Sequence, residues 1–218
     1  MSSSRIDGSA TPSTALIDGY RHGRVPRPVR EQQLLDIAEQ QFALRGYDGV
    51  SIEEIARLAG VSRPIVYDYF GDKEAVYLAC LRRARAELEK MILEAAASAT
   101  TPRDTLERAT AAYFEFVERR GQQWTVLFGG AGLSGYGAAE AEQLRFATVS
   151  RIRDLIAALE PGVDPVTAEA FAHAISGAAE QVAKWWRANP QLTREDVLAR
   201  QSAFAWGGLG QLFGEPHR

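Results

Sequence analysis

Apolar residues recur at spacings of three and four along most of the chain, which is the period of an amphipathic helix. The first such stretch runs from Glu31 to the residue before Gly46, and others follow to about residue 213. No segment shows the sustained alternation or the tight turns that are typical of β-strands. The pattern therefore predicts an all-α protein of about nine helices.

Two short helices are predicted close together near the start of this series. Ser51 followed by Glu54 is a capping-box signal for one helix, and Gly60 ends it. Ser62 begins the next helix, with Pro64 in its first turn, where a missing N–H is tolerated. Two short helices joined by a turn that contains glycine are typical of a helix-turn-helix, whose second helix enters the major groove of DNA.

Longer helices are predicted beyond this pair. Asp72 can cap a helix over residues 73–96, and further helices begin at Thr101, Asp164 and Thr193. The glycine-rich segment 129–137 predicts a loop that precedes another long helix.

Residues 1–27 are rich in Ser, Gly, Thr, Pro and Arg and have no apolar period, which predicts a flexible basic arm. The whole chain has a formal net charge of −3, which argues against a protein that coats nucleic acid with its entire surface. Residues 21–30 nevertheless contain four arginines and no acid. An arm of this kind could enter the minor groove beside a DNA-reading helix.

The sequence favours a cytoplasmic protein with no membrane partner. No apolar run approaches the ~18 residues of a membrane span, and the N-terminal residues lack the pattern of a secretory signal. The single cysteine, Cys80, permits no internal disulfide. No motif indicates a cofactor.

A set of short motifs lies within residues 28–88. It comprises Gly46-Tyr47 at a helix end, Ser51 as a cap, Ile55-Ala56, the turn Ala59-Gly60-Val61-Ser62, and Tyr67-Asp68-Tyr69-Phe70 followed by Lys73. Together these motifs resemble the DNA-binding domain of the TetR family of transcriptional regulators. The resemblance implies a helix-turn-helix at residues 51–70 and a helical ligand-binding and dimerisation domain over residues 89–218.

Carried over residue by residue, the resemblance implies which side chains meet DNA. Arg63 and Pro64 would face base edges, because arginine can donate two hydrogen bonds to guanine and proline can touch a thymine methyl. Hydroxyls, helix starts and an ammonium group are phosphate ligands. The other residues expected at the DNA are Ser51, Ser62, Tyr67, Tyr69 and Lys73.

Each of these residues also has a purely structural interpretation. Ser51 can be only a helix cap, the tyrosines can be core residues, and Arg63 can be a solvated charge. Two residues of the reading helix depart from the family pattern. Pro64 stiffens the start of that helix, and Asp68 would repel a nearby phosphate.

The resemblance further implies a small-molecule effector that binds between the helices of the second domain. The candidate contacts are Tyr113, Phe116, Trp124, Phe128 and Phe146, with His173 as a polar contact. For any one of these aromatics a core position is the more common role, and a core histidine is the favoured interpretation of His173.

The last two helices are predicted to pair two copies of the chain in a four-helix contact. The first helix offers small residues with Trp185 as an anchor, and the second offers large apolar residues. The residues concerned are Ala170, Ala174, Gly177, Ala178, Gln181, Leu198, Phe204, Trp206, Leu209 and Phe213. The alternative is that they pack within one chain.

The sequence thus predicts a dimeric repressor that leaves a palindromic double-stranded operator when it binds an apolar or amphipathic ligand. One alternative is an architectural DNA-binding protein that responds to no ligand. A remote alternative is a helical metal-dependent enzyme that uses Glu169, His173 and Glu180. The chain has no zincin motif, nucleophile elbow or dinucleotide-binding fingerprint, so a protein that is not an enzyme is favoured.

Overall fold

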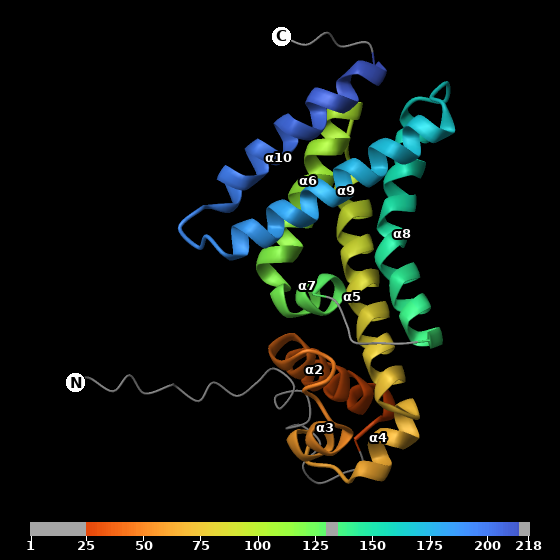
Figure 1. Ribbon diagram of the computed structural model, residues 1–218, viewed down its shortest axis with the longest axis vertical. Coiled ribbons are helices and arrows are strands. Elements are labelled where there is room, and N and C mark those ends of the chain that lie inside the picture. Colours follow the sequence, from red (N-terminus) through yellow and green to blue (C-terminus); the bar gives the residue numbers. More distant parts are fainter. Residues whose placement is uncertain (1–24, 130–134, 214–218) are drawn as a thin grey trace, which may run out of the picture. The chain divides into compact units, whose positions relative to one another are not determined.

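The computed structural model describes residues 25–129 and 135–213, and within these ranges the chain forms nine α-helices, one 3-10 helix and no strand (Figure 1). The predicted all-α class is confirmed. Contacts divide the chain into two compact units, one up to Cys80 and one from Leu81 onward. The division falls inside α5 (Lys73–Ala96), earlier than the limit at residue 88 expected from the sequence.

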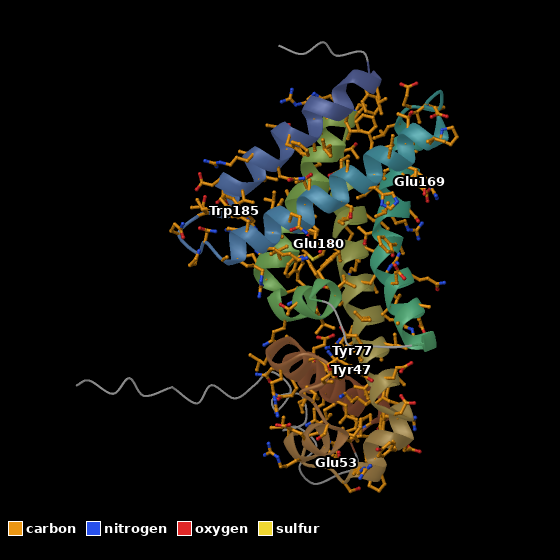
Figure 2. The ribbon with its side chains drawn as sticks, viewed as in Figure 1. Tyr47, Glu53, Tyr77, Glu169, Glu180 and Trp185 are labelled. Carbon is orange, nitrogen blue, oxygen red and sulfur yellow. The ribbon has the colours of Figure 1, made fainter. Side chains whose placement is uncertain are left out.

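The first unit packs three helices and the start of α5 around one core. The three are α2 (Arg27–Arg45), α3 (Ile52–Leu58) and α4 (Arg63–Phe70). Ile55 and Val66 are fully buried, so α3 and α4 each turn their predicted apolar side inward. Tyr77 stands edge-on to Phe42 and Tyr47, with ring centroids 5.0 Å and 5.3 Å apart (Figure 2). These ring contacts hold the start of α5 against α2.

The first helix begins earlier than its apolar pattern suggests. α2 starts at Arg27 rather than at Glu31, because Pro28 suits a first helical turn whatever the apolar period. Arg27 therefore belongs to the helix and not to the predicted arm. The rest of that arm, up to residue 24, lies outside the described residues.

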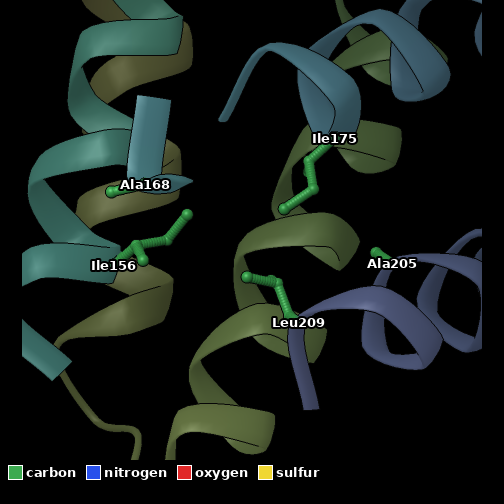
Figure 3. Close-up of a cluster of buried hydrophobic side chains, with 5 residues drawn as sticks. All are labelled: Ile156, Ala168, Ile175, Ala205 and Leu209. Carbon is green, nitrogen blue, oxygen red and sulfur yellow. The ribbon is translucent and has the colours of Figure 1, made fainter. Parts of the chain in front are cut away.

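The second unit contains the remainder of α5 and all later helices. These are α6 (Pro102–Arg119), α7 (Gly121–Phe128), α8 (Gly135–Leu159), α9 (Pro165–Arg187), α10 (Arg194–Leu209) and the 3-10 helix η1 (Gly210–Phe213). α9 packs along α8, and α10 packs on α6 and α9. Figure 3 shows part of the resulting core, in which Ile156 of α8, Ala168 and Ile175 of α9, and Ala205 and Leu209 of α10 are buried.

Local side-chain caps fix several of these helix starts, as predicted. The side chains of Thr101, Asp164 and Thr193 each accept a hydrogen bond from a backbone N–H in the first turn, at 2.9–3.1 Å. The predicted loop over residues 129–137 is wrong at its C-terminal end, because α8 already begins at Gly135. Glycine costs a helix only about 1 kcal/mol relative to alanine, so the helix-forming residues that follow can extend α8 through it. Residues 130–134 lie outside the described part of the chain.

Candidate nucleic-acid interface and ligand cavity

A glycine turn sets the path from α3 into α4. Gly60 N–H donates to the Arg57 carbonyl at 3.2 Å, and Val61 N–H donates to the Ala56 carbonyl at 3.0 Å, which is the Schellman pattern. Gly60 has a φ of 65°, a left-handed conformation that residues with a Cβ rarely adopt. The turn thus fixes the direction of α4.

Ser51 caps α3, but the predicted capping box is only half formed. Ser51 Oγ accepts a hydrogen bond from Glu54 N–H at 3.2 Å. The Glu54 carboxylate does not return the bond. It pairs with Arg45 of α2 and lies 3.9 Å from Arg57, because these guanidinium groups offer it charged partners. The Ser51 side chain remains exposed, where a phosphate could reach its hydroxyl.

α4 presents most of its length to solvent and fully buries only Val66. Arg63, Pro64 and Tyr67 are exposed, and Tyr69 is half-buried. Ser62 is the N-cap residue, and its exposed side chain makes no capping hydrogen bond. A helix that is exposed along one side and held by a single buried residue can enter a groove of DNA without unfolding.

Arg63 is held in place by two neighbours. Its Nη1 lies 2.6 Å from Glu53 Oε1, and its Nη2 donates to the Tyr67 hydroxyl at 2.8 Å. The guanidinium also lies over the Tyr67 ring, 5.1 Å from its centroid. The hydrogen bond to Tyr67, and then the charge of Glu53, raise the pKa of Arg63. The predicted base-reading side chain is thus extended along the surface of the helix pair.

Two cationic side chains lie over the rings of Tyr47 and Tyr69. Lys73 Nζ sits 4.2 Å above the Tyr47 ring centroid, and the Arg27 guanidinium lies 4.5 Å from that of Tyr69. Burial, followed by the charges of Glu74, Asp72 and Asp48, raises the pKa of Tyr47. Tyr47 therefore stays neutral and can support the ammonium of Lys73.

Asp68, which would repel phosphate, is paired with Arg27. Arg27 Nη1 lies 3.2 Å from Asp68 Oδ2, and Nη2 donates to the Asp68 carbonyl oxygen at 3.3 Å. The bridge connects the first residue of α2 to the reading helix. It offsets the negative charge of Asp68, a compensation that the sequence did not reveal because the two residues lie far apart in the chain.

A largely apolar cavity lies within the second unit. Its volume is about 90 Å³, measured as the space open to the centre of a water-sized sphere, which is enough for several waters or a small organic molecule. α6 and α8 supply most of the wall. Its lining residues include Ile92, Leu106, Ala109, Thr110, Ile152, Leu155, Ile156, Ile175, Gln201 and Phe213.

Two of the six predicted ligand contacts line this cavity, Tyr113 and Phe128. Phe116 is completely buried in the core. Trp124 is also buried, and its Nε1 donates to the Tyr113 hydroxyl at 3.0 Å. Burial raises the pKa of Tyr113, although the Trp124 hydrogen bond lowers it, so the hydroxyl stays protonated at neutral pH.

Phe146 and His173 lie outside the cavity. Their rings are 6.2 Å apart on an exposed part of α8 and α9, and His173 is not the core residue that was favoured. The aliphatic residues that form most of the wall were missed. In the sequence, these residues appear only as part of the apolar side of α6 and α8, and that pattern is the same for a cavity wall as for a packed core.

Comparisons with known proteins agree over most of the chain. Residues 34–80 match the model of "Bacterial regulatory proteins, tetR family", and residues 102–208 match "Tetracyclin repressor-like, C-terminal domain". The HTH-type transcriptional activator FasR of Mycolicibacterium smegmatis is 31% identical over 197 residues, which cover 89% of this chain and 90% of FasR. The chain belongs to the TetR family. It is therefore a DNA-binding transcriptional regulator and not an enzyme, as predicted.

Solved structures show the same TetR-family fold. A TetR-like regulator from Rhodococcus sp. RHA1 has a TM-score of 0.71 at 30% identity, over 86% of this chain and 99% of that one. AibR, solved in complex with isovaleryl coenzyme A and operator DNA, has a TM-score of 0.66 at 20% identity, over 80% of this chain and 95% of that one.

In this TetR-family chain, α9 carries the exposed small residues that were predicted to form a dimer contact. Ala170, Ala174, Gly177 and Gln181 are exposed. Trp185, which Figure 2 labels on the same helix, is 47% exposed. On α10, Phe204 is 64% exposed. Other predicted contacts pack within the chain. Leu209 is buried in the core, and Trp206 stacks on Phe213 with ring centroids 5.9 Å apart.

The three residues of the metal-site alternative do not form one site in this TetR-family structure. Glu180 pairs with Lys184 at 2.5 Å, and His173 faces Phe146. Within residues 25–129 and 135–213, no group of three or more potential ligands is arranged to hold a metal ion. In the same ranges, no helix is both long and apolar enough to cross a membrane.

Proposed function

We propose that the chain is a dimeric repressor that leaves a palindromic operator when an apolar or amphipathic ligand occupies the cavity of the second unit. The observation that carries the proposal is the presence, in one chain, of an exposed reading helix and a separate apolar cavity. An architectural DNA-binding protein needs no such cavity. Because its partner is DNA, we place the protein in the cytoplasm.

The exposed residues Ala170, Ala174, Gly177 and Gln181 form a stripe along α9, and this exposed stripe supports pairing of two copies. Small residues let two helices approach closely, and the exposed rings of Trp185 on α9 and Phe204 on α10 offer apolar area to a partner. A two-fold pair would present two copies of α4 to half-sites about 34–36 Å apart on one side of the DNA.

Contacts between α8 and α5 offer a route from the cavity to the DNA-reading unit. Arg151 Nε of α8 lies 2.5 Å from Glu89 Oε1 of α5, and Arg85 binds the other carboxylate oxygen at 3.3 Å. Arg85 also donates to the Leu144 carbonyl of α8 at 3.3 Å. Ile152 and Leu155 of α8 line the cavity, so a ligand that moves α8 would displace α5, which continues into the first unit.

A second candidate function is activation of transcription, which the name of the relative FasR favours. Transcription in vitro from a promoter that carries a DNA site bound by this protein separates repression from activation. A repressor lowers the transcript level when it is added without ligand, and an activator raises it.

A footprinting titration tests the ligand response. Protection of the operator should require more protein when a cavity ligand is present, because a ligand shifts an equilibrium only by its differential affinity for the two states. Equal protection with and without every ligand that binds the cavity contradicts the proposal.

A further inference from the structure

Gln201 places an unused hydrogen-bonding group in the wall of the cavity. It lies on α10, lines the cavity and is only 2% exposed. Its Nε2 atom has no hydrogen-bond partner among the described residues. Buried polar groups in folded proteins are almost always hydrogen-bonded, so an unpartnered donor in a cavity wall points to a group that the cavity receives.

Two other polar groups of the wall already have partners. The Tyr113 hydroxyl accepts the hydrogen bond from Trp124, and the Thr105 hydroxyl donates to the Thr101 carbonyl at 3.0 Å. Two further buried atoms lack partners in the described part of the chain, Gln123 Oε1 and Ser202 Oγ, but neither residue lines the cavity. Of these three buried unpartnered atoms in the described part of the chain, only Gln201 Nε2 belongs to a residue that lines the cavity.

The charge of the wall limits what Gln201 can meet. The residues that line the cavity include no lysine, arginine, histidine, aspartate or glutamate. A carboxylate or phosphate placed beside Gln201 would be buried without a counter-charge, which is strongly unfavourable. The acceptor must therefore be uncharged, and the remainder of the ligand must match an aliphatic and aromatic surface.

We propose that the ligand of this cavity is an apolar molecule with an uncharged acceptor, a carbonyl oxygen, that takes a hydrogen bond from Gln201 Nε2. The inference rests on the proposed effector role of the cavity and adds the chemical class of the ligand. It also assigns Gln201 as a specificity residue, because a site that is built to hydrogen-bond a ligand discriminates against an analogue that lacks the bonding atom.

Two probes of nearly the same shape test this assignment on the full-length protein. Acetophenone carries a C=O group where α-methylstyrene carries C=CH₂, so only the ketone can accept a hydrogen bond. The dissociation constants of both probes are measured by calorimetry for the wild type, for Gln201→Leu and for Gln123→Leu. Differences in the hydration of the two probes cancel when their affinity ratio is compared between proteins.

In the wild type, the ratio of the two affinities should favour the ketone. Gln201→Leu should lower that ratio by about tenfold, because the ketone loses one hydrogen bond from a buried donor. Gln123→Leu removes an amide whose Oε1 is buried and unpartnered but that does not line the cavity, so the ratio should stay at its wild-type value. The Gln201→Leu protein should also unfold at a higher temperature in the absence of ligand, since it no longer buries an unpartnered amide.

The outcomes separate this inference from the proposed function. If both probes bind and Gln201→Leu leaves their ratio unchanged, the carbonyl assignment is wrong, while a ligand-binding cavity stands. If neither probe binds the wild type, both the cavity as an effector site and the carbonyl assignment are overturned.

Discussion

Arg63 and Glu53 form an ion pair across the exposed side of the helix-turn-helix, with Nη1 of the arginine 2.6 Å from Oε1 of the glutamate. Both side chains are 55% exposed, so the pair adds little to the stability of the fold. It does occupy the guanidinium that the family resemblance assigns to base reading. In that role, operator DNA would have to compete with Glu53 for Arg63, and Glu53 would also bring a negative charge toward the phosphates.

Replacing Glu53 by glutamine should strengthen operator binding several-fold, because it removes both the competing partner and the repulsive charge. The free energy of unfolding should change by no more than about 0.5 kcal/mol, as for most exposed substitutions. Fluorescence anisotropy with a labelled operator measures the affinity. Glu115→Gln is the control, since it removes a half-buried carboxylate that is paired with Arg119 in the second unit. Weaker binding by Glu53→Gln would show instead that Glu53 positions Arg63 for DNA.

The bridge between Arg27 and Asp68 makes a second prediction. Arg27→Ala leaves Asp68 uncompensated beside the DNA, so affinity should fall by a similar factor for operator and for unrelated duplexes. The double variant Arg27→Ala with Asp68→Asn should recover much of that loss. Competition binding with both kinds of DNA provides the measurement. Equal losses in the single and double variants would mean that Arg27 acts on the phosphates directly and not through Asp68.

Glu89 should couple the cavity to α5 without touching ligand or DNA. Glu89→Gln weakens its bonds to Arg151 and Arg85, so operator affinity without ligand should remain while the ligand-induced loss of affinity becomes smaller. Footprinting with and without ligand measures both quantities. Glu107→Gln, which removes an exposed partner of Arg103 on α6, is the control. An unchanged ligand response in Glu89→Gln would exclude this route.

Glu89 also predicts a dependence of stability on pH. Burial raises the pKa of Glu89. The hydrogen bonds and charges of Arg151 and Arg85 together lower it by more than burial raises it, so the net pKa lies below the ordinary 4.5. A lowered pKa in the folded state means that the stabilisation is complete above 4.5 and is lost as the pH falls through the folded-state value. The difference in unfolding free energy between wild type and Glu89→Gln should therefore shrink below this pH in denaturant titrations.

If two copies pair through the exposed stripe on α9, a charge introduced into that stripe should prevent pairing. Ala174→Glu would bury a carboxylate in each copy at a contact of small residues, so the protein should become monomeric and bind its operator at least about tenfold more weakly. Sedimentation equilibrium and circular dichroism report the mass and the helix content. Ala158→Glu on an exposed position of α8 is the control. A dimer of unchanged stability in Ala174→Glu would place the contact elsewhere.

Local features of the sequence predicted well those helix starts that a side chain caps. Thr193 and its neighbours determine one end of α10 through bonds inside a single turn, so no distant residue is needed to predict it. The glycine turn at Gly60 was predictable for the same reason. The family motifs likewise placed Arg63 and Tyr67 on an exposed helix.

Features that depend on packing between distant helices could not be predicted in this way. Phe116 and Phe128 are both aromatic residues near the end of a helix, yet one is core and the other lines the cavity. Which side of α6 faces the cavity depends on how α10 and α9 pack on it. The Arg27–Asp68 bridge and the burial of the Gln201 amide also depend on tertiary structure, and no local sequence pattern predicts them.

Selection of bound duplexes from a random DNA pool tests the central claim, that this chain reads DNA through α4 as a symmetric pair. The wild type should enrich one palindrome with half-site centres about one helical turn apart. Arg63→Ala should enrich the same spacing but lose preference at one base pair in each half-site, at a cost of ~1–3 kcal/mol for that contact. Failure of the wild type to enrich any sequence, or an identical winning sequence with Arg63→Ala, would contradict the account.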